Sequence, residues 1–135
     1  MKKSLAVGAT SLLLAGCQTW GPTWSEVTGA RFDDMASMTI GPVLINLIDG
    51  SSPLQGGPRQ PIKVTPGKHT MQLQAVPPDP VMGRIALEEI TVELQPCMRY
   101  YINARFSSST STEWRPFIDK AEGIAGCQVT PPGKG

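Results

Sequence analysis

The chain has 135 residues, of which 40% are hydrophobic and 17% are charged, and its formal net charge is +1. This length fits one ordinary domain, and the near-neutral charge excludes a highly charged disordered chain and gives no general attraction to nucleic acid. Fourteen glycines and thirteen prolines favour short strands joined by turns, while a single histidine and three cysteines leave few residues for catalytic or metal sites.

The N-terminus has the charge and the length of a secretory signal. Lys2 and Lys3 precede an apolar stretch that runs from Leu5 to Ala15. As a helix this stretch would cover only about half of a ~30 Å hydrocarbon core, so it is too short to span a membrane. A positive segment followed by a short apolar segment is typical of an export signal.

The end of this stretch, LAGC at 14–17, resembles a bacterial lipobox. The resemblance implies cleavage before Cys17, a signal peptide at 1–16, a lipidated tether at 17–23 and stable anchoring by acyl chains such as palmitate. Gln18, in place of an aspartate, favours sorting to the outer membrane, which we expect the protein to occupy on the periplasmic face. The alternative is an ordinary signal peptide with an incidental cysteine.

The other two cysteines form a pair. With Cys17 assigned to the lipid, Cys97 and Cys127 remain in an exported, oxidising compartment, where an even number of cysteines predicts a disulfide. A redox pair and a metal site are the alternatives. The spacing is not that of a CxxC motif, and no histidine lies near either cysteine in the sequence, so a structural bridge is the preferred interpretation.

Residues 24–129 are expected to form one domain of six to eight short strands, followed by a flexible tail at 130–135. The expected strands are 24–32 (a first edge strand), 43–48, 62–64, 70–75, 85–94 (with a β-bulge or break at Glu88-Glu89), 100–106, 114–118 and 124–129.

Two of these segments alternate with a clear period of two, which indicates strands with one buried face. The residues predicted to face inward are Met71, Leu73 and Ala75 in one segment and Tyr100, Ile102, Ala104 and Phe106 in the other. No segment has a convincing helical stripe, although residues 116–123 leave a helix open. The sequence therefore predicts an all-β fold, a small antiparallel β-sandwich with one disulfide.

Two blocks of the sequence carry further resemblances. Asp49-Gly50, followed by the segment 62–69 and an alternating strand, is similar to PEGA-type surface-layer repeats, which are small β-sandwich modules of cell-envelope proteins. The block from Pro96 to Cys127 resembles uncharacterised proteobacterial lipoproteins. This second resemblance supports the disulfide and the envelope location, and it implies no activity.

Residues that could carry catalysis or bind a metal are sparse. His69 is the only histidine and lies beside a predicted turn, without the sequence context of a nucleophile or an oxyanion hole. The couplets Asp33-Asp34 and Glu88-Glu89 would point to opposite faces of a strand, so neither forms an acid–base pair by itself. We therefore expect a non-enzymatic protein with no cofactor and no metal.

Three tryptophans are candidates for contact with a partner or a ligand, because aromatic side chains anchor interfaces. They are Trp20, Trp24 and Trp114. Trp20 and Trp24 lie close to the lipid site, so packing at the membrane interface is an equal alternative for them. Trp114 is also expected to fill the core next to the disulfide.

These features predict an outer-membrane lipoprotein that acts as an envelope interaction or assembly module with a protein partner. The alternative is a glycan- or small-ligand-binding module that uses the tryptophans. Removal of residues 1–16 leaves ten basic and eleven acidic residues, so the mature net charge is −1 and no nucleic-acid partner is expected.

Overall fold

The computed structural model describes residues 23–33, 37–53 and 60–127, which form an all-β fold with no helix. The strands are β1 (Ser25–Thr28), β2 (Ile40–Gly41), β3 (Val43–Ile48), β4 (Ile62–Val64), β5 (Gly67–Ala75), β6 (Glu88–Leu94), β7 (Met98–Phe106) and β8 (Trp114–Gly123). Among the described residues there is thus no helix that could cross a membrane. The predicted fold class is confirmed.

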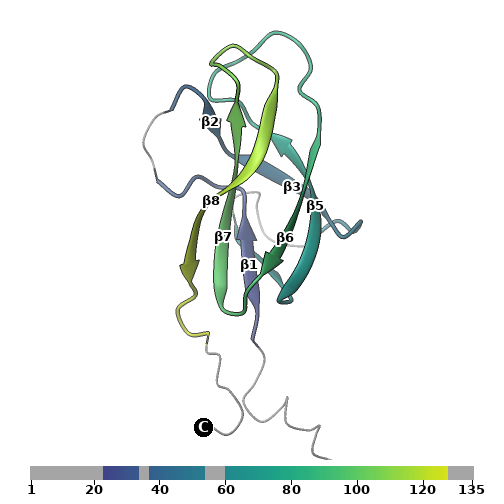
Figure 1. Cartoon of the computed structure of the whole chain (residues 1–135), viewed down its shortest axis with the longest axis vertical. Coiled ribbons are helices and arrows are strands. Elements are labelled where there is room, and N and C mark those ends of the chain that lie inside the picture. Colours follow the sequence, from purple (N-terminus) through teal and green to yellow (C-terminus); the bar gives the residue numbers. More distant parts are fainter. Residues whose placement is uncertain (1–22, 34–36, 54–59, 128–135) are drawn as a thin grey trace, which may run out of the picture.

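The strands form two sheets (Figure 1). In the larger sheet, β8 pairs along one edge of β7, and β1 and β2 pair with different parts of β7, with β4 beyond β1. The smaller sheet has the order β3-β5-β6. The side chains between the sheets form the core, whose largest fully buried members are Met71, Leu73, Leu94 and Ile102.

The alternating segments 70–75 and 100–106 are strands as predicted, and each lies within a longer strand of nine residues, β5 or β7. Met71, Leu73 and Ala75 of β5 are buried, whereas Gln74 is exposed. On β7 the predicted inward-facing residues are all buried, namely Tyr100, Ile102, Ala104 and Phe106. A period of two places alternate side chains on one face, and burial of that face in the sandwich fixes the register of each strand.

The expected first strand differs in length and in position. β1 covers only Ser25–Thr28, and it is not an edge strand, because it pairs with β4 on one side and with β7 on the other. Its pairing with β7 is parallel. The prediction of a wholly antiparallel sandwich is therefore wrong at this pair of strands. The buried hydroxyl of Ser25 is satisfied by a 2.7 Å bond from its Oγ to the carbonyl oxygen of Gln95.

The C-terminal part of the domain is one long strand. β8 runs from Trp114 to Gly123 and pairs antiparallel with the whole of β7, so residues 116–123 are strand rather than helix. The register shifts between Tyr101 and Ile102, which accommodates one extra residue in β8. Ile124 to Cys127 form a turn instead of the predicted last strand, whose remaining residues 128 and 129 lie outside the described chain.

The phase slip predicted at Glu88-Glu89 is a strand boundary. β6 begins at Glu88, and residues 84–87 before it belong to no strand. Of the two alternatives, the break is therefore confirmed, and the expected strand over Ile85 and Leu87 is wrong.

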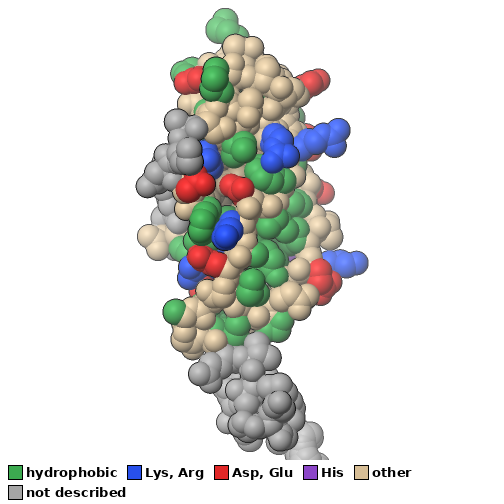
Figure 2. Space-filling view, turned by 60° about the vertical axis from the view of Figure 1, so that its left-hand side comes forward, with side chains coloured by type: hydrophobic (Ala, Val, Ile, Leu, Met, Phe, Trp, Pro, Cys, Tyr) green, Lys and Arg blue, Asp and Glu red, His purple; other side chains and the backbone are tan. Residues whose placement is uncertain are grey.

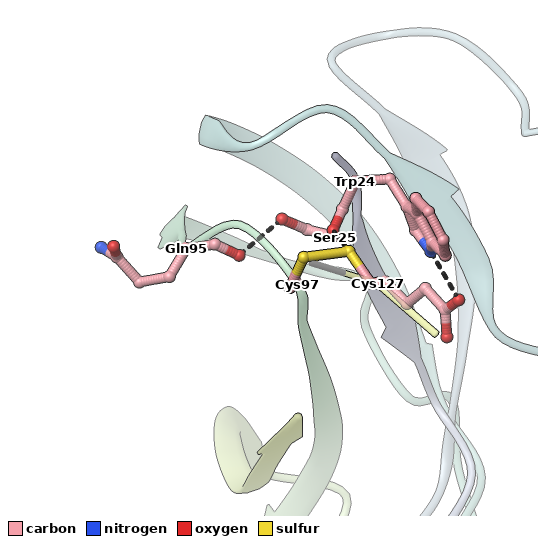
Figure 3. The surroundings of a disulfide bond; sticks show 6 residues. Trp24, Ser25, Gln95, Cys97 and Cys127 are labelled. Atoms are coloured by element: carbon pink, nitrogen blue, oxygen red, sulfur yellow. Dashed lines mark hydrogen bonds between the residues drawn. A yellow bond between two sulfur atoms is a disulfide. The ribbon is translucent and has the colours of Figure 1, made fainter. Parts of the chain in front are cut away.

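The predicted disulfide between Cys97 and Cys127 is present, with a Cα–Cα distance of 5.4 Å (Figure 3). It joins the residue before β7 to the turn after β8. The backbone N–H of Cys97 donates to the carbonyl oxygen of Trp24 at 2.8 Å, which brings the start of the described chain to the same place. We call this the disulfide end, and the opposite end, with the β7–β8 turn (107–113), the distal end.

Removal of the bridge is expected to destabilise the domain strongly. The two cysteines are 30 residues apart in the sequence, for which the chain-entropy model gives about 3–4 kcal/mol. Urea unfolding of the double variant Cys97→Ala/Cys127→Ala should show this loss relative to the wild type. Cys17→Ser, which leaves the bridge intact, is the control, and a loss below about 1 kcal/mol in the double variant would contradict the expectation.

Candidate functional site

The candidate tryptophans do not form one platform. Trp24 lies at the disulfide end, directly before β1, and Trp114 begins β8 at the distal end. A nine-residue strand such as β7 spans about 26–30 Å, which separates the two side chains. Trp20 lies outside the described residues.

Trp24 is engaged by its own sheet. Its indole Nε1 donates to Oε2 of Glu26 at 2.9 Å, and Nζ of Lys63 lies 4.5 Å from the centroid of its ring. Lys63 is the partner of Glu26 in the β1–β4 register, so these contacts follow directly from strand pairing. A half-buried Trp24 held in this way contributes to the sheet more than to a free binding surface.

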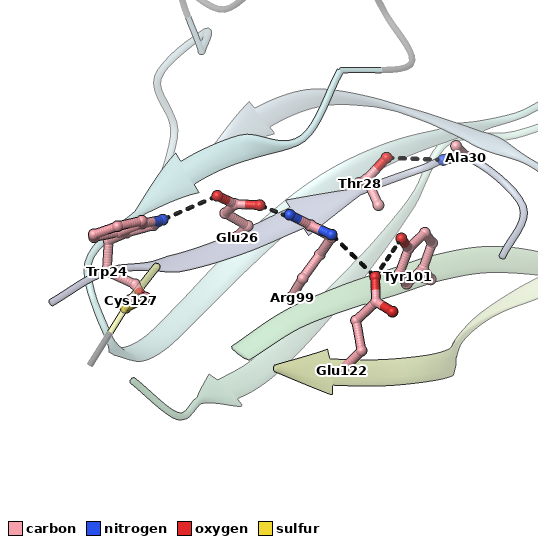
Figure 4. Close-up of polar contacts among 8 residues, drawn as sticks. All are labelled: Trp24, Glu26, Thr28, Ala30, Arg99, Tyr101, Glu122 and Cys127. Atoms are coloured by element: carbon pink, nitrogen blue, oxygen red, sulfur yellow. Dashed lines mark hydrogen bonds and ion pairs between the residues drawn. The ribbon is translucent and has the colours of Figure 1, made fainter. Parts of the chain in front are cut away.

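The outer face of the larger sheet carries a row of ion pairs (Figure 4). The registers place Glu26 of β1 beside Arg99 of β7, and Arg99 beside Glu122 of β8. Arg99 Nε donates to Glu26 Oε1 at 2.7 Å, and its Nη1 donates to Glu122 Oε2 at 3.0 Å. The Tyr101 hydroxyl donates to the same Glu122 oxygen at 2.7 Å. One guanidinium thus links three strands through charge-assisted hydrogen bonds.

These contacts shift the pKa of each member of the row. Burial raises the pKa of Glu26. The bonds from the Trp24 indole and from Arg99 together lower it by more, so the net pKa lies below the usual 4.5. The bond from Tyr101, followed by Arg99, lowers the pKa of Glu122. The bond to Glu26 raises the pKa of Arg99 above its already high value. Burial, and then the bond to Glu122, raise the pKa of Tyr101.

Asn103 is a buried polar residue that the strand pattern did not reveal. The alternation of β7 places Asn103 on the outer face of the sheet, yet its side chain is fully buried. Its Nδ2 donates to the carbonyl oxygens of Gly29, Ala30 and Ile102 at 2.9–3.1 Å, so the chain that leaves β1 lies over it. No sequence signal predicted this contact, because it joins residues 73 and 74 positions apart.

His69 connects two turns, because its ring contacts both Asp49 and the backbone of Thr65. Its side chain is only 12% exposed, with Nδ1 at 2.5 Å from Asp49 Oδ2 and Nε2 at 2.7 Å from the carbonyl oxygen of Thr65. That carbonyl can only accept, so Nε2 donates to it and is not free to take the proton of the nearby Thr65 hydroxyl. Asp49 also accepts from the backbone N–H of Thr70, and this bond, with that of His69, lowers the pKa of Asp49.

The two acidic couplets, Asp33-Asp34 and Glu88-Glu89, do not come together in one site among the described residues. Asp33 forms an ion pair with Arg31, and Asp34 lies outside the described residues. Glu88 is partly buried and Glu89 is exposed in β6. In the described part of the chain, no group of three or more His, Cys, Asp or Glu side chains is arranged to hold a metal ion.

Trp114 lies in the core, but not next to the disulfide as predicted. It is 6% exposed, its ring centroid is 6.4 Å from that of Phe106, and its Nε1 donates to the carbonyl oxygen of Ala86 at 2.8 Å. The correction follows from the direction of β8, whose first residue lies opposite the last residue of β7.

Trp114 forms part of the wall of a hollow of about 840 Å³ at the distal end. There, residues 84–88 meet the end of β7, the start of β8 and the turn between these two strands. The charged lining residues are Arg84, Glu88, Arg105, Glu113 and Arg115. The sequence alone does not bring these arginines together, because their proximity depends on strand pairing and on the path of the β5–β6 connection.

The free energy of unfolding should fall as the pH drops below about 4.5, the usual pKa of a glutamate. The folded protein holds the pKa of Glu26 below that value, so the unfolded chain binds the proton first. The stabilisation is complete above the unfolded-state pKa and is lost as the pH falls through the folded-state pKa. Glu26→Gln should therefore show a shallower acid decline in urea titrations between about pH 3 and pH 7.

Glu93→Gln is the matched control for this experiment. Glu93 is exposed on β6 and has no hydrogen bond or ion pair to another described side chain. The free energy of unfolding of this variant should fall with decreasing pH as steeply as that of the wild type. An equally steep decline in Glu26→Gln and in the wild type would show that the row of ion pairs does not contribute to the pH dependence.

Comparison with models of known protein families, with curated proteins and with solved structures finds no match to this chain. A function assigned to the protein therefore follows from its own residues.

Proposed function

We propose that the protein is an outer-membrane lipoprotein, anchored through Cys17 and facing the periplasm, whose β-sandwich acts as an envelope interaction or assembly module. The observation that carries this proposal is the direction in which the chain enters the domain. Trp24 lies at the disulfide end, seven residues after Cys17, and the exposed groups described below lie at the distal end. A lipid on Cys17 would leave the distal end free to meet a partner.

The anchor supplies the mechanism of this module. Acyl chains hold the protein at the membrane, and confinement to a surface raises its effective concentration toward other membrane-bound proteins. Such a module gains from a domain that stays folded in an oxidising compartment, and the Cys97–Cys127 bridge supports this role.

The distal end offers exposed apolar side chains for a protein partner. Met82 is 93% exposed and Met38 is 67% exposed, and Leu87 and Val76 are also exposed at 49% and 38%. They lie beside β2 and in the connection between β5 and β6, at the upper end of the molecule in Figure 1. Hydrophobic side chains also protrude at the top of the face shown in Figure 2. Exposed apolar groups are a feature of interaction surfaces.

The exposed edge of β8 supports the proposal less. β8 has a neighbour only in β7, so its other edge is open among the described strands. That strand contains Pro116, Asp119 and Lys120, and proline and charged residues are the means by which edge strands avoid pairing with other chains.

A second candidate function, a glycan- or small-ligand-binding module, is favoured by one observation. Trp114 borders a hollow whose volume lies within the range of ligand pockets, about 300–1,000 Å³. Trp24 does not add to this candidate, because its indole is bonded to Glu26. Under both candidates the protein binds rather than catalyses.

Metabolic labelling with radioactive palmitate tests the anchor. The wild type should carry the label and fractionate with the outer membrane, whereas Cys17→Ser should lose both the label and the membrane association. The variant Cys97→Ala/Cys127→Ala keeps Cys17 and should remain labelled. Equal labelling of the wild type and Cys17→Ser would overturn the lipoprotein assignment.

The same wild type and Cys17→Ser pair tests the interaction role when a photoreactive residue replaces Met82. A discrete cross-linked envelope protein should appear in the anchored protein and be absent from Cys17→Ser. Lys68, which is exposed near the disulfide end of β5, is the matched position and should give no such product. Identical products from both positions would contradict a partner at the distal end.

A further inference from the structure

The distal hollow has the architecture of a binding site built from the fold. Arg105 and Arg115 belong to paired strands, and Arg84 comes from the segment that precedes β6. The bond from Trp114 Nε1 to the carbonyl oxygen of Ala86 ties this segment to β8. β6 and β8, which are outer strands of the two sheets, contact each other, and Glu88 of β6 and residues of β8 line the hollow. Every lining residue belongs to the described chain.

The charges of the hollow are not balanced internally. Among the described residues, Arg84, Arg105 and Arg115 form no ion pair, although Glu88 and Glu113 line the same hollow. Three guanidinium groups against two carboxylates leave a net positive charge. At the disulfide end the situation is the reverse, because Arg99 contacts two carboxylates.

The strand register makes this arrangement costly without a ligand. Arg105 and Arg115 are direct cross-strand partners, and like charges in that position repel each other. Among the described residues, the Arg105 guanidinium lies over the ring of Phe117, 4.2 Å from its centroid. This cation–π contact offsets part of the repulsion but supplies no negative charge. An anion between the arginines would remove the repulsion.

The hollow offers little apolar surface. Trp114 and Phe106 also line it, but they are 6% and 3% exposed and, as strand neighbours of Arg115 and Arg105, point to the core face of the sheet. The guanidinium fork matches the geometry of phosphate and carboxylate oxygens. A phosphate monoester carries nearly two negative charges near pH 7, and it can accept hydrogen bonds from two forks at once.

We propose that the distal hollow binds a phosphate monoester, whose oxygens meet the guanidinium groups of Arg84, Arg105 and Arg115. This site deepens the second candidate function and does not depend on the lipid at Cys17. The phosphate monoester is common to soluble phosphate esters and to lipid headgroups.

Calorimetric titration of the detergent-solubilised full-length protein with phenyl phosphate tests the site. Saturable binding with a submillimolar Kd is expected at about 0.15 M salt, and the indole N–H resonance of Trp114 should shift with the same Kd. Inorganic phosphate offers the same oxygens to the arginines and should compete with phenyl phosphate for the site. Reconstitution with vesicles that contain phosphatidic acid distinguishes the sources: arginine-dependent binding to them identifies a lipid headgroup, and binding of phenyl phosphate alone identifies a soluble ester.

The double variant Arg84→Gln/Arg115→Gln should bind phenyl phosphate at least tenfold more weakly, with an unchanged melting temperature because both side chains are exposed. Lys68→Gln/Lys120→Gln removes the same charge away from the hollow and should bind like the wild type. No saturable binding, equal affinity in the arginine variant, or an equal loss in the lysine variant would each overturn the site. None of these results would alter palmitate labelling of Cys17, so failure of the site and failure of the lipoprotein assignment are distinguishable.

Discussion

The larger sheet depends on the insertion of β1 between β4 and β7. This strand has four residues, and β4 has no other neighbour among the described strands. Ser25, Val27 and Thr28 are each at most 2% exposed, so the insertion is part of the core and not a surface contact. Backbone pairing on both sides and the bond from Ser25 to Gln95 fix the strand in place. The N-terminal end of the described chain is thereby integrated into the fold.

The insertion of β1 gives the two ends of the domain different properties. At the disulfide end, a covalent bridge, a parallel strand pair and the Glu26–Arg99–Glu122 row cross-link the same three strands. The charges of this row are paired, and the Trp24 indole is bonded to Glu26. At the distal end, apolar side chains are exposed and three arginines have no ion pair among the described residues. These differences support the proposals of ligand recognition at the distal end and of a lipid anchor at the disulfide end.

Much of the fold could be predicted where the signal is local. The alternation in β5 and β7 identified their buried faces, because a period of two is a property of each strand alone. The cysteine count identified the Cys97–Cys127 bridge. The position of β1 could not be predicted, because Ser-Glu-Val-Thr has no apolar alternation and its partners lie about 40 and 73 residues away. Only the first five residues of β8 were predicted as strand, because most of its residues are exposed and burial left little pattern in its sequence.

The candidate site was less predictable than the fold for the same reason. Trp114 was correctly expected in the core, but its distance from the disulfide depends on the direction of β8. The arginines of the hollow come from three segments, and only strand pairing brings two of them together. Asn103 and His69 are held by bonds to backbone or side-chain groups that are 74 and 20 residues away, respectively. Sequence periodicity carries no information about such contacts.

Native-state hydrogen exchange tests the central position of β1 most directly. The most protected amides of β1 should exchange only through global unfolding, with the same apparent free energy as the core amides of β7, such as those of Ile102 and Ala104. Exchange of every β1 amide through a local opening, at a free energy well below that of β7, would contradict this account. It would show that the N-terminal strand is a separable edge segment and that the disulfide end is not built around it.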